Sequence, residues 1–140
     1  MAKHRDLEAL RSLRLFSACS TRELQQIARL VDEVSAEPGQ VIVKEGAVAR
    51  EAFVIVDGRV GVSVKDEQVA ELGPGQHFGE LALLDGGPRT ATVTALTALD
   101  LLVIHRPAFM GLLDEHPAIA RRIMATMASV IRDLEHPVGD

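Results

Sequence analysis

The spacing of apolar residues along this chain divides its 140 positions into three regions. In residues 3–31, apolar side chains recur every three or four positions, which predicts helices with one buried face. Ser20 and Glu23 have the spacing of a capping box and mark the start of a second helix. The apolar face would be formed by Leu7, Leu10, Leu13, Leu24, Ile27, Leu30 and Val31.

Residues 32–104 have a different pattern, in which short runs of Val and Ile alternate with turn residues. The dipeptide Asp57-Gly58 predicts a hairpin between strands at residues 53–56 and 60–64. Two further strands are expected at residues 91–97 and 99–104. Many short strands with frequent turns indicate a β-sandwich or jelly roll, which leaves few open sheet edges.

Residues 106–135 return to a helical pattern, and Pro107 and Pro117 mark two separate helix starts. The second of these helices has an apolar stripe made of Ile119, Ile123, Met127, Val130, Ile131 and Leu134. The expected fold class is therefore α+β, with a β-roll or jelly-roll sandwich flanked by N-terminal helices and two C-terminal helices. We expect a single domain over residues 1–140, made of helices at 1–31, a β-roll at 32–104 and helices at 105–140.

The composition is that of an ordinary globular protein, with 47% hydrophobic and 25% charged residues. A net charge of −5 disfavours non-specific attraction to nucleic acid or anionic lipid. Cys19 is the only cysteine, which excludes an intramolecular disulfide, and we expect it to be a small buried residue before a helix. The charged first residues and the lack of an apolar run of about 20 residues favour a cytoplasmic protein without a membrane span.

The segment FGELALLDGGPRTATV, residues 78–93, carries the chemistry of this sequence. Gly79 allows the backbone to approach a ligand closely, and Glu80 can accept hydrogen bonds from a sugar hydroxyl. Residues 80–84 favour a short helix, whose first-turn N–H groups would point at an anion. Arg89 adds a permanent charge and a fork of donors that matches two phosphate oxygens. Together these groups suit a small phosphate ester that carries a ribose.

This segment resembles the phosphate-binding cassette of cyclic nucleotide-binding domains, such as those of protein kinase A regulatory subunits and the bacterial catabolite activator protein. The matching positions are Phe78, Gly79, Glu80, Leu81, Ala82, Leu83, Pro88, Arg89, Thr90, Ala91, Thr92 and Val93. The resemblance implies that Glu80 binds the ribose 2′-hydroxyl and that Arg89 pairs with the cyclic phosphate. It also implies that backbone N–H groups near Leu81 and Ala82, together with Thr90 and Ala91, complete the phosphate cradle.

The same resemblance implies where the base of the nucleotide lies. Val60, Val62 and Leu72 would form an apolar slot in the sheet, although as core residues they need no ligand. Arg122, Thr126 or Ser129 from the last helix would close the slot, although a solvated polar face explains them equally well. Thr90 leaves the base open, and we favour cAMP over cGMP, with a cyclic dinucleotide as a weaker possibility. No cofactor is expected.

Three other interpretations remain at this point. The segment can be a capped helix and a turn, with Arg89 as a solvated surface charge. The fold can also serve as a protein-interaction module that binds no ligand. A cupin-like metalloenzyme shares the β-roll, but the five histidines, His4, His77, His105, His116 and His136, are scattered. His77 adjoins the segment and is expected to be a loop residue, and no catalytic pattern indicates an enzyme.

The expected partners follow from the same resemblance. The sequence ends at Asp140, a few residues after the last helix, so we expect no helix-turn-helix and no DNA binding. The apolar stripe of the last helix favours either a homodimer or packing against the protein's own sheet. We expect a receptor whose C-terminal helices move when ligand binds and which signals to an effector that the sequence does not name.

Overall fold

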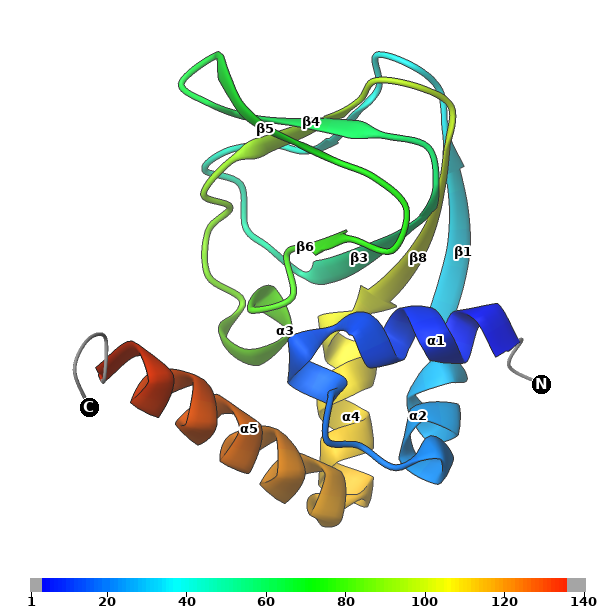
Figure 1. Cartoon of the computed structure of the whole chain (residues 1–140), viewed down its shortest axis with the longest axis vertical. Helices are drawn as coiled ribbons and strands as arrows, with labels where there is room; N and C mark the ends of the chain where they lie inside the picture. The colour runs from blue at the N-terminus through cyan, green and yellow to red at the C-terminus, as the bar shows by residue number, and fades with distance from the viewer. Residues whose placement is uncertain (1–3, 136–140) are drawn as a thin grey trace. The chain divides into compact units, whose positions relative to one another are not determined.

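The structure is a computed structural model, and it describes residues 4–135. The chain forms two compact units, which are described separately (Figure 1). One unit contains residues 30–110 and includes every strand of the described chain. The other unit contains residues 4–29 and 111–135 and is helical. The proposed single domain is not tested by this division and stays a prediction.

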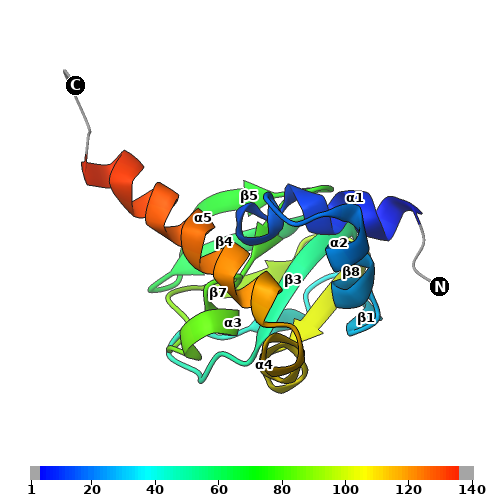
Figure 2. The same ribbon diagram turned by 90° about the horizontal axis from the view of Figure 1, so that it is seen from below.

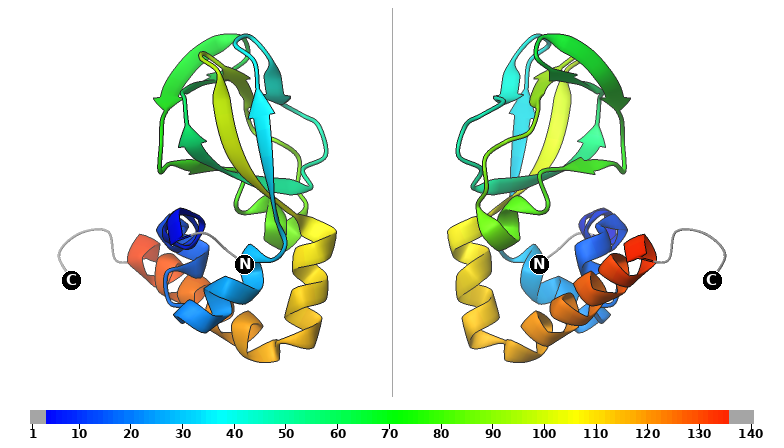
Figure 3. Two further views of the ribbon diagram at one scale, coloured as in Figure 1. Left: turned by 90° about the vertical axis from the view of Figure 1, so that its right-hand side faces the viewer. Right: turned by 90° about the vertical axis from the view of Figure 1, so that its left-hand side faces the viewer.

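Residues 30–110 form an antiparallel sandwich of two four-stranded sheets, which Figures 1 and 3 show as two layers. One sheet has the strand order β1-β8-β3-β6 and the other the order β2-β7-β4-β5. This architecture confirms the predicted fold class. The strands are β1 (Val31–Ala36), β2 (Val41–Val43), β3 (Glu51–Asp57), β4 (Val60–Val64), β5 (Glu67–Leu72), β6 (His77–Phe78), β7 (Thr92–Ala95) and β8 (Leu99–His105).

The core between the sheets is built from side chains that alternate along each strand. On β3, Phe53 and Ile55 face this core, and Phe53 stacks on Phe78 of β6 with ring centroids 4.8 Å apart. The remaining core residues are aliphatic, as the low aromatic content predicts. They are Ala36, Val43, Val60, Val93, Ala95, Leu99, Leu101 and Val103.

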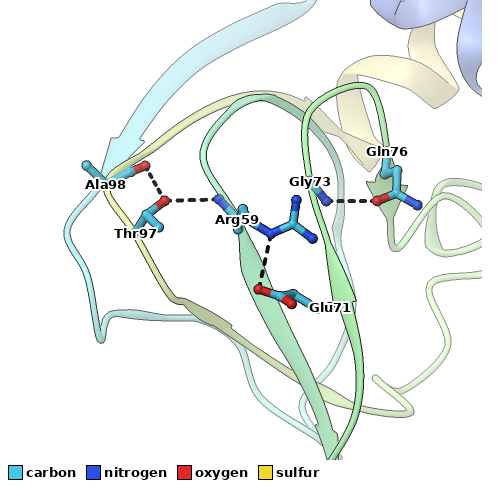
Figure 4. Close-up of polar contacts among 6 residues, drawn as sticks. All are labelled: Arg59, Glu71, Gly73, Gln76, Thr97 and Ala98. Carbon is cyan, nitrogen blue, oxygen red and sulfur yellow. Dashed lines mark hydrogen bonds and ion pairs between the residues drawn. The ribbon is translucent and has the colours of Figure 1, made fainter.

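The hairpin predicted at Asp57-Gly58 is wrong. A turn does occur there, but β3 and β4 lie in different sheets, so the turn carries the chain across the sandwich. Gly58 has a φ of +95°, and a side chain there would collide with the carbonyl of Ala98. Thr97 accepts the Arg59 N–H at 3.0 Å and holds the end of this turn (Figure 4). Contacts with the β7–β8 connection therefore determine that the chain crosses between the sheets. These contacts are distant in sequence, so the Asp57-Gly58 motif alone cannot predict them.

The hairpin that does follow joins β4 to β5. Its turn residues, Lys65 and Asp66, both have positive φ angles, of 52° and 67°, as a type I′ turn requires. The Glu45 carboxylate accepts the Lys65 N–H at 2.9 Å and ties the turn to the loop after β2. Glu67 directly follows this turn and is the first residue of β5.

The helical unit contains α1 (His4–Ser12), the 3₁₀ turn η1 (Arg14–Phe16), α2 (Thr21–Ala28) and α5 (Pro117–Glu135), which Figure 2 shows from below. The helix α4 (Arg106–Glu115) begins in the sandwich unit and ends in this one. Pro107 and Pro117 lie in the first turns of α4 and α5, as predicted. The buried thiol of Cys19 precedes α2, which confirms its expected structural position.

The predicted helical stretch at residues 3–31 extends too far. Residue 3 lies outside the described residues, and α2 ends at Ala28. Leu30 lies in the following turn, and Val31 begins β1, where it pairs with Ile104 of β8. Strand pairing takes Val31 out of the helical pattern, because a β-branched residue fits a sheet well.

The start of α2 is held by the predicted capping box. Ser20 Oγ accepts the Glu23 N–H at 3.1 Å, and Glu23 Oε1 accepts the Ser20 N–H at 2.9 Å. Arg122 of α5 donates to the same Glu23 oxygen at 2.7 Å. Burial alone would raise the pKa of Glu23, but the Ser20 hydrogen bond and the Arg122 charge lower it below its ordinary value.

We expect the Glu23→Gln variant to lose less stability in acid than the wild type. Gln keeps the capping geometry but has no charge for Arg122 and does not titrate. Because the pKa of Glu23 is lowered by folding, its contribution is complete above the ordinary carboxyl pKa of about 4.3 and is lost as pH falls below it. Urea unfolding of both proteins at pH 7 and pH 3 measures the difference. Equal losses in the two proteins would contradict the expectation.

The apolar stripe of α5 is buried only at its N-terminal end. Ile119 and Ile123 are buried, whereas Met127 and Val130 are half-buried. Further along, Ile131 and Leu134 are exposed by 54% and 74%. The second half of this stripe is therefore open in the described chain. Within residues 4–135, none of the helices combines the length and apolar character of a membrane-spanning segment.

Candidate ligand-binding site

The cassette segment forms a tight turn and a short helix at one end of the sandwich (Figure 1). The helix α3 (Ala82–Asp85) begins two residues later than predicted, because Glu80 and Leu81 form a turn before it. The Ala82 N–H donates to the Gly79 carbonyl at 3.2 Å, and the Leu83 N–H to the Glu80 carbonyl at 3.1 Å. The Ala82 N–H, which we expected to face an anion, is thus engaged within the turn.

Gly79 is required at its position for two reasons. Its φ of +77° lies in the region that favours glycine. A Cβ atom there would lie 2.5 Å from Arg89 Nη1 and 3.1 Å from the Glu51 carbonyl oxygen. The missing side chain therefore makes the space in which the Arg89 guanidinium lies.

Arg89 is buried, with only 9% of its surface exposed. Its Nη2 lies 3.6 Å from Glu51 Oε1, and its guanidinium carbon lies 5.7 Å from the centre of the Phe53 ring. Burial lowers the pKa of Arg89 below its ordinary value, and the Glu51 carboxylate partly opposes this effect. Arg89 is thus held as a buried cation by its neighbours and is not the solvated surface charge of the alternative interpretation.

The guanidinium of Arg89 also has a spare donor. Its Nη1 is buried, and within residues 4–135 no acceptor lies within hydrogen-bonding distance of it. A buried donor without a partner is unfavourable by about 1–3 kcal/mol. An anion that accepts from Nη1 would therefore relieve this cost as well as balance the charge.

A cavity of about 720 Å³ adjoins the guanidinium, a size typical of small-molecule sites. All the residues predicted to contact phosphate or ribose line it: Gly79, Glu80, Leu81, Ala82, Arg89, Thr90 and Ala91. Among the predicted base-slot residues, Val62 and Leu72 also line the cavity. Val60 does not appear in the lining, because it is fully buried in the core between the sheets. The structure thus does not bring Val60 to the cavity, and its role as a wall of the slot stays a prediction.

The apolar wall of the cavity contains Val62, which was predicted, and three residues that the sequence analysis did not assign to the slot: Val43, Val93 and Ala70. Val43, Val93, Val62 and Ala70 are successive cross-strand partners on β2, β7, β4 and β5. They form one row across the sheet, but each belongs to a different strand. Alternation along single strands marks them as inward-facing, and only the strand order shows that they are neighbours.

His77 lies in β6 and not in a loop, so that prediction was wrong. It lines the cavity, and within the described chain its buried Nδ1 has no hydrogen-bond partner. Among residues 4–135, no group of three or more His, Cys, Asp or Glu side chains is arranged to hold a metal ion. His136 lies outside the described residues.

The proposed lid residues belong to the helical unit, whereas the cavity belongs to the sandwich unit. Arg122 pairs with Glu23, as described above, and Thr126 Oγ1 donates to the Arg122 carbonyl at 3.0 Å. Ser129 is exposed. Their role in closing the base slot stays a prediction.

A family model described as the cyclic nucleotide-binding domain matches residues 33–116. The chain belongs to this family. Its match to a cyclic nucleotide-gated potassium channel of Rhizobium etli is 38% identical over 122 residues, which are 87% of this chain and 34% of the channel. The cyclic nucleotide-binding domain described here thus spans about a third of that relative.

Solved structures support the same assignment. The N-terminal domain of a transcriptional regulator from Streptomyces coelicolor A3(2) superposes with a TM-score of 0.86 at 28% identity, covering 94% of this chain and 98% of that one. The catabolite activator protein of Thermus thermophilus gives a TM-score of 0.69 at 25% identity, covering 87% of this chain and 60% of that one. The resemblance drawn from the cassette residues is thereby confirmed.

Proposed function

We propose that this domain is a receptor for a cyclic mononucleotide, with cAMP preferred over cGMP. The observation that carries the proposal is the buried Arg89 guanidinium, which belongs to a residue that lines the cavity and whose Nη1 has no hydrogen-bond partner in the described chain. A cyclic phosphodiester bears one negative charge and two exposed oxygens, which match a cation with forked donors. The fit is improved by Gly79, which leaves room for the guanidinium.

The rest of the cavity suits the ribose and the base. Glu80 lines the cavity, and in this proposal its carboxylate accepts a hydrogen bond from the ribose 2′-hydroxyl. The row made of Val43, Val93, Val62 and Ala70 offers a flat apolar wall for a purine ring. Thr90 also lines the cavity, and its hydroxyl offers a polar group that a guanine base can contact. We favour cAMP because the wall offers an adenine ring only apolar contact.

The output of such a receptor is a change of conformation. We propose that ligand draws the helices of residues 106–135 toward the cassette, with Arg122 or Thr126 closing the base slot. This requires Arg122 to leave Glu23, so the ligand must bind the closed arrangement more tightly than the open one. The exposed half of the α5 stripe then provides a surface for an effector or for a second copy of the chain.

The competing function is a protein-interaction module that binds no nucleotide. The open apolar half of α5 favours it, whereas the buried Arg89 beside a cavity argues against it. We propose no catalytic activity, and we keep the cytoplasm as the compartment because of the single buried thiol.

Calorimetric titration and thermal unfolding with cAMP and cGMP test the proposal. At free ligand about 100-fold above its dissociation constant, binding adds roughly 2.7 kcal/mol to the free energy of unfolding and raises the melting temperature. We expect this shift with cAMP and a smaller one with the same concentration of cGMP. No heat and no shift with either nucleotide at millimolar concentration would favour the interaction module.

A further inference from the structure

A contact at the start of α4 lies directly behind the cassette. Arg106 is the first residue of α4, and its Nη2 donates to the carbonyl oxygen of Leu84 in α3 at 2.9 Å. Its backbone N–H donates to the carbonyl of Arg50, just before β3, at 2.7 Å. A single residue thus joins the end of the cassette helix, the start of β3 and the first turn of α4.

The fit around this guanidinium is close. Gly86 ends α3 with a φ of +63°, and its N–H donates to the Ala82 carbonyl at 3.0 Å. A Cβ atom on Gly86 would lie 3.4 Å from Arg106 Nε and 3.5 Å from Arg106 Cδ. A cation at the C-terminal end of a helix is also electrostatically favoured. The Arg106 side chain therefore packs on the turn that ends α3, so a shift of this turn also shifts the guanidinium that is bonded to it.

The contact is incomplete in this arrangement. Arg106 Nε is buried, and in the described part of the chain no acceptor lies within reach of it. A buried N–H without a partner is unfavourable, so any second arrangement in which Nε also donates a hydrogen bond would gain free energy from that bond. Two such arrangements of the Arg106 contact would couple α3 energetically to α4.

The ligand site encloses α3 from both ends. The residues proposed to touch the nucleotide precede α3 at Gly79 and Glu80 and follow it at Arg89. Since α3 has only four residues, a ligand held at both of its ends also fixes the position of its last carbonyls. One of these, the Leu84 carbonyl, is the acceptor for Arg106.

We infer that Arg106 is a positioning residue that couples the nucleotide-binding cassette to α4, so that occupancy of the cavity changes the stability of α4. This inference rests on the proposed function. It assigns to one side chain the step between the bound nucleotide and the C-terminal helices.

Hydrogen exchange on the full chain, with and without saturating cAMP, tests the inference. In the wild type, we expect cAMP to slow amide exchange both in α3 and in α4. In Arg106→Gln, we expect the slowing in α3 to remain and the slowing in α4 to fall at least about threefold. The slowing in α3 is compared with the slowing in α4 of the same variant at saturating cAMP. A uniform loss of stability would affect both helices and would not reduce the slowing in α4 alone.

Arg59→Gln is the matched control. Arg59 also donates one side-chain hydrogen bond, but its acceptor is Glu71 of β5, which belongs to neither α3 nor α4 (Figure 4). In Arg59→Gln, cAMP should slow amide exchange in α3 and in α4 as much as it does in the wild type. If Arg106→Gln does not fold, Arg106→Lys takes its place in the experiment, because Lys keeps the charge but lacks the forked guanidinium that donates to the Leu84 carbonyl. Its control is Arg59→Lys.

The outcomes separate this inference from the proposed function. If the wild type gives no calorimetric heat and no slowing with cAMP or cGMP, the proposed function fails. If cAMP binds but leaves α4 unchanged in the wild type, the coupling through Arg106 is refuted. It is also refuted if cAMP slows exchange in α4 of Arg106→Gln, or of Arg106→Lys in its place, as much as it does in the wild type.

Discussion

The Arg89→Ala variant is expected to bind cAMP about 30-fold to several thousand-fold more weakly than the wild type. The wild-type guanidinium is buried, fixed by Gly79 and Phe53, and has a donor directed at no protein acceptor. Removing the partner of a buried charge costs roughly 2–5 kcal/mol, and each factor of ten corresponds to about 1.4 kcal/mol. The measurement is a calorimetric titration of both proteins with cAMP.

Folding of this variant should be nearly normal. Without nucleotide, Arg89 is a buried cation whose ion pair with Glu51 is long, at 3.6 Å, and such a pair adds little to stability. The Glu51 side chain is 36% exposed, so water can hydrate its carboxylate after the change. Arg59→Ala is the matched control, because it removes an arginine from an exposed ion pair and should leave binding unchanged. Wild-type affinity in Arg89→Ala would remove Arg89 from the site.

The second large effect is expected for Gly79→Ala, which adds one methyl group. The φ of +77° disfavours any residue with a Cβ atom, by roughly 1–2 kcal/mol. In addition, the new Cβ would lie 2.5 Å from Arg89 Nη1, so the guanidinium must leave its position. We expect a loss of stability together with more than a tenfold loss of cAMP affinity, measured by urea unfolding and calorimetry.

Gly75→Ala isolates the steric part of this effect. Gly75 has a similar φ, of +84°, but its added Cβ would meet nothing within 4 Å. This control should lose about the same stability from backbone strain and keep its affinity for cAMP. Equal affinities in Gly79→Ala and Gly75→Ala would show that the position of the guanidinium does not matter for binding.

Much of the fold could be predicted because its signals are local. The capping box at Ser20, the helix starts at Pro107 and Pro117, and strand β4 all depend on neighbouring residues, and the structure bears them out. The hairpin expected at Asp57-Gly58 failed for the opposite reason. Its outcome depends on contacts of Gly58 with the β7–β8 connection, about 40 residues away in the sequence.

The candidate site divides in the same way. The phosphate and ribose residues lie within one continuous segment, so a single motif predicted them, and all of them line the cavity. The base wall is assembled from β2, β4, β5 and β7, and its membership depends on register. Val60 lies outside this lining, because a period of two identifies the inward face of a strand but not how deeply each residue on that face is buried.

Strand β5 forms one border of the sheet β2-β7-β4-β5, with its residues 67–71 exposed to solvent. Such a border offers unpaired backbone groups to any other extended chain, which is a common route to aggregation. Two features counteract this tendency. Glu67 and Glu71 place negative charge at both ends of the exposed stretch, and an irregularity in the pairing at Val62 and Ser63 interrupts its regular spacing. Self-association by adding strands at this border is thus disfavoured, and concentrated solutions should not form fibrils through it.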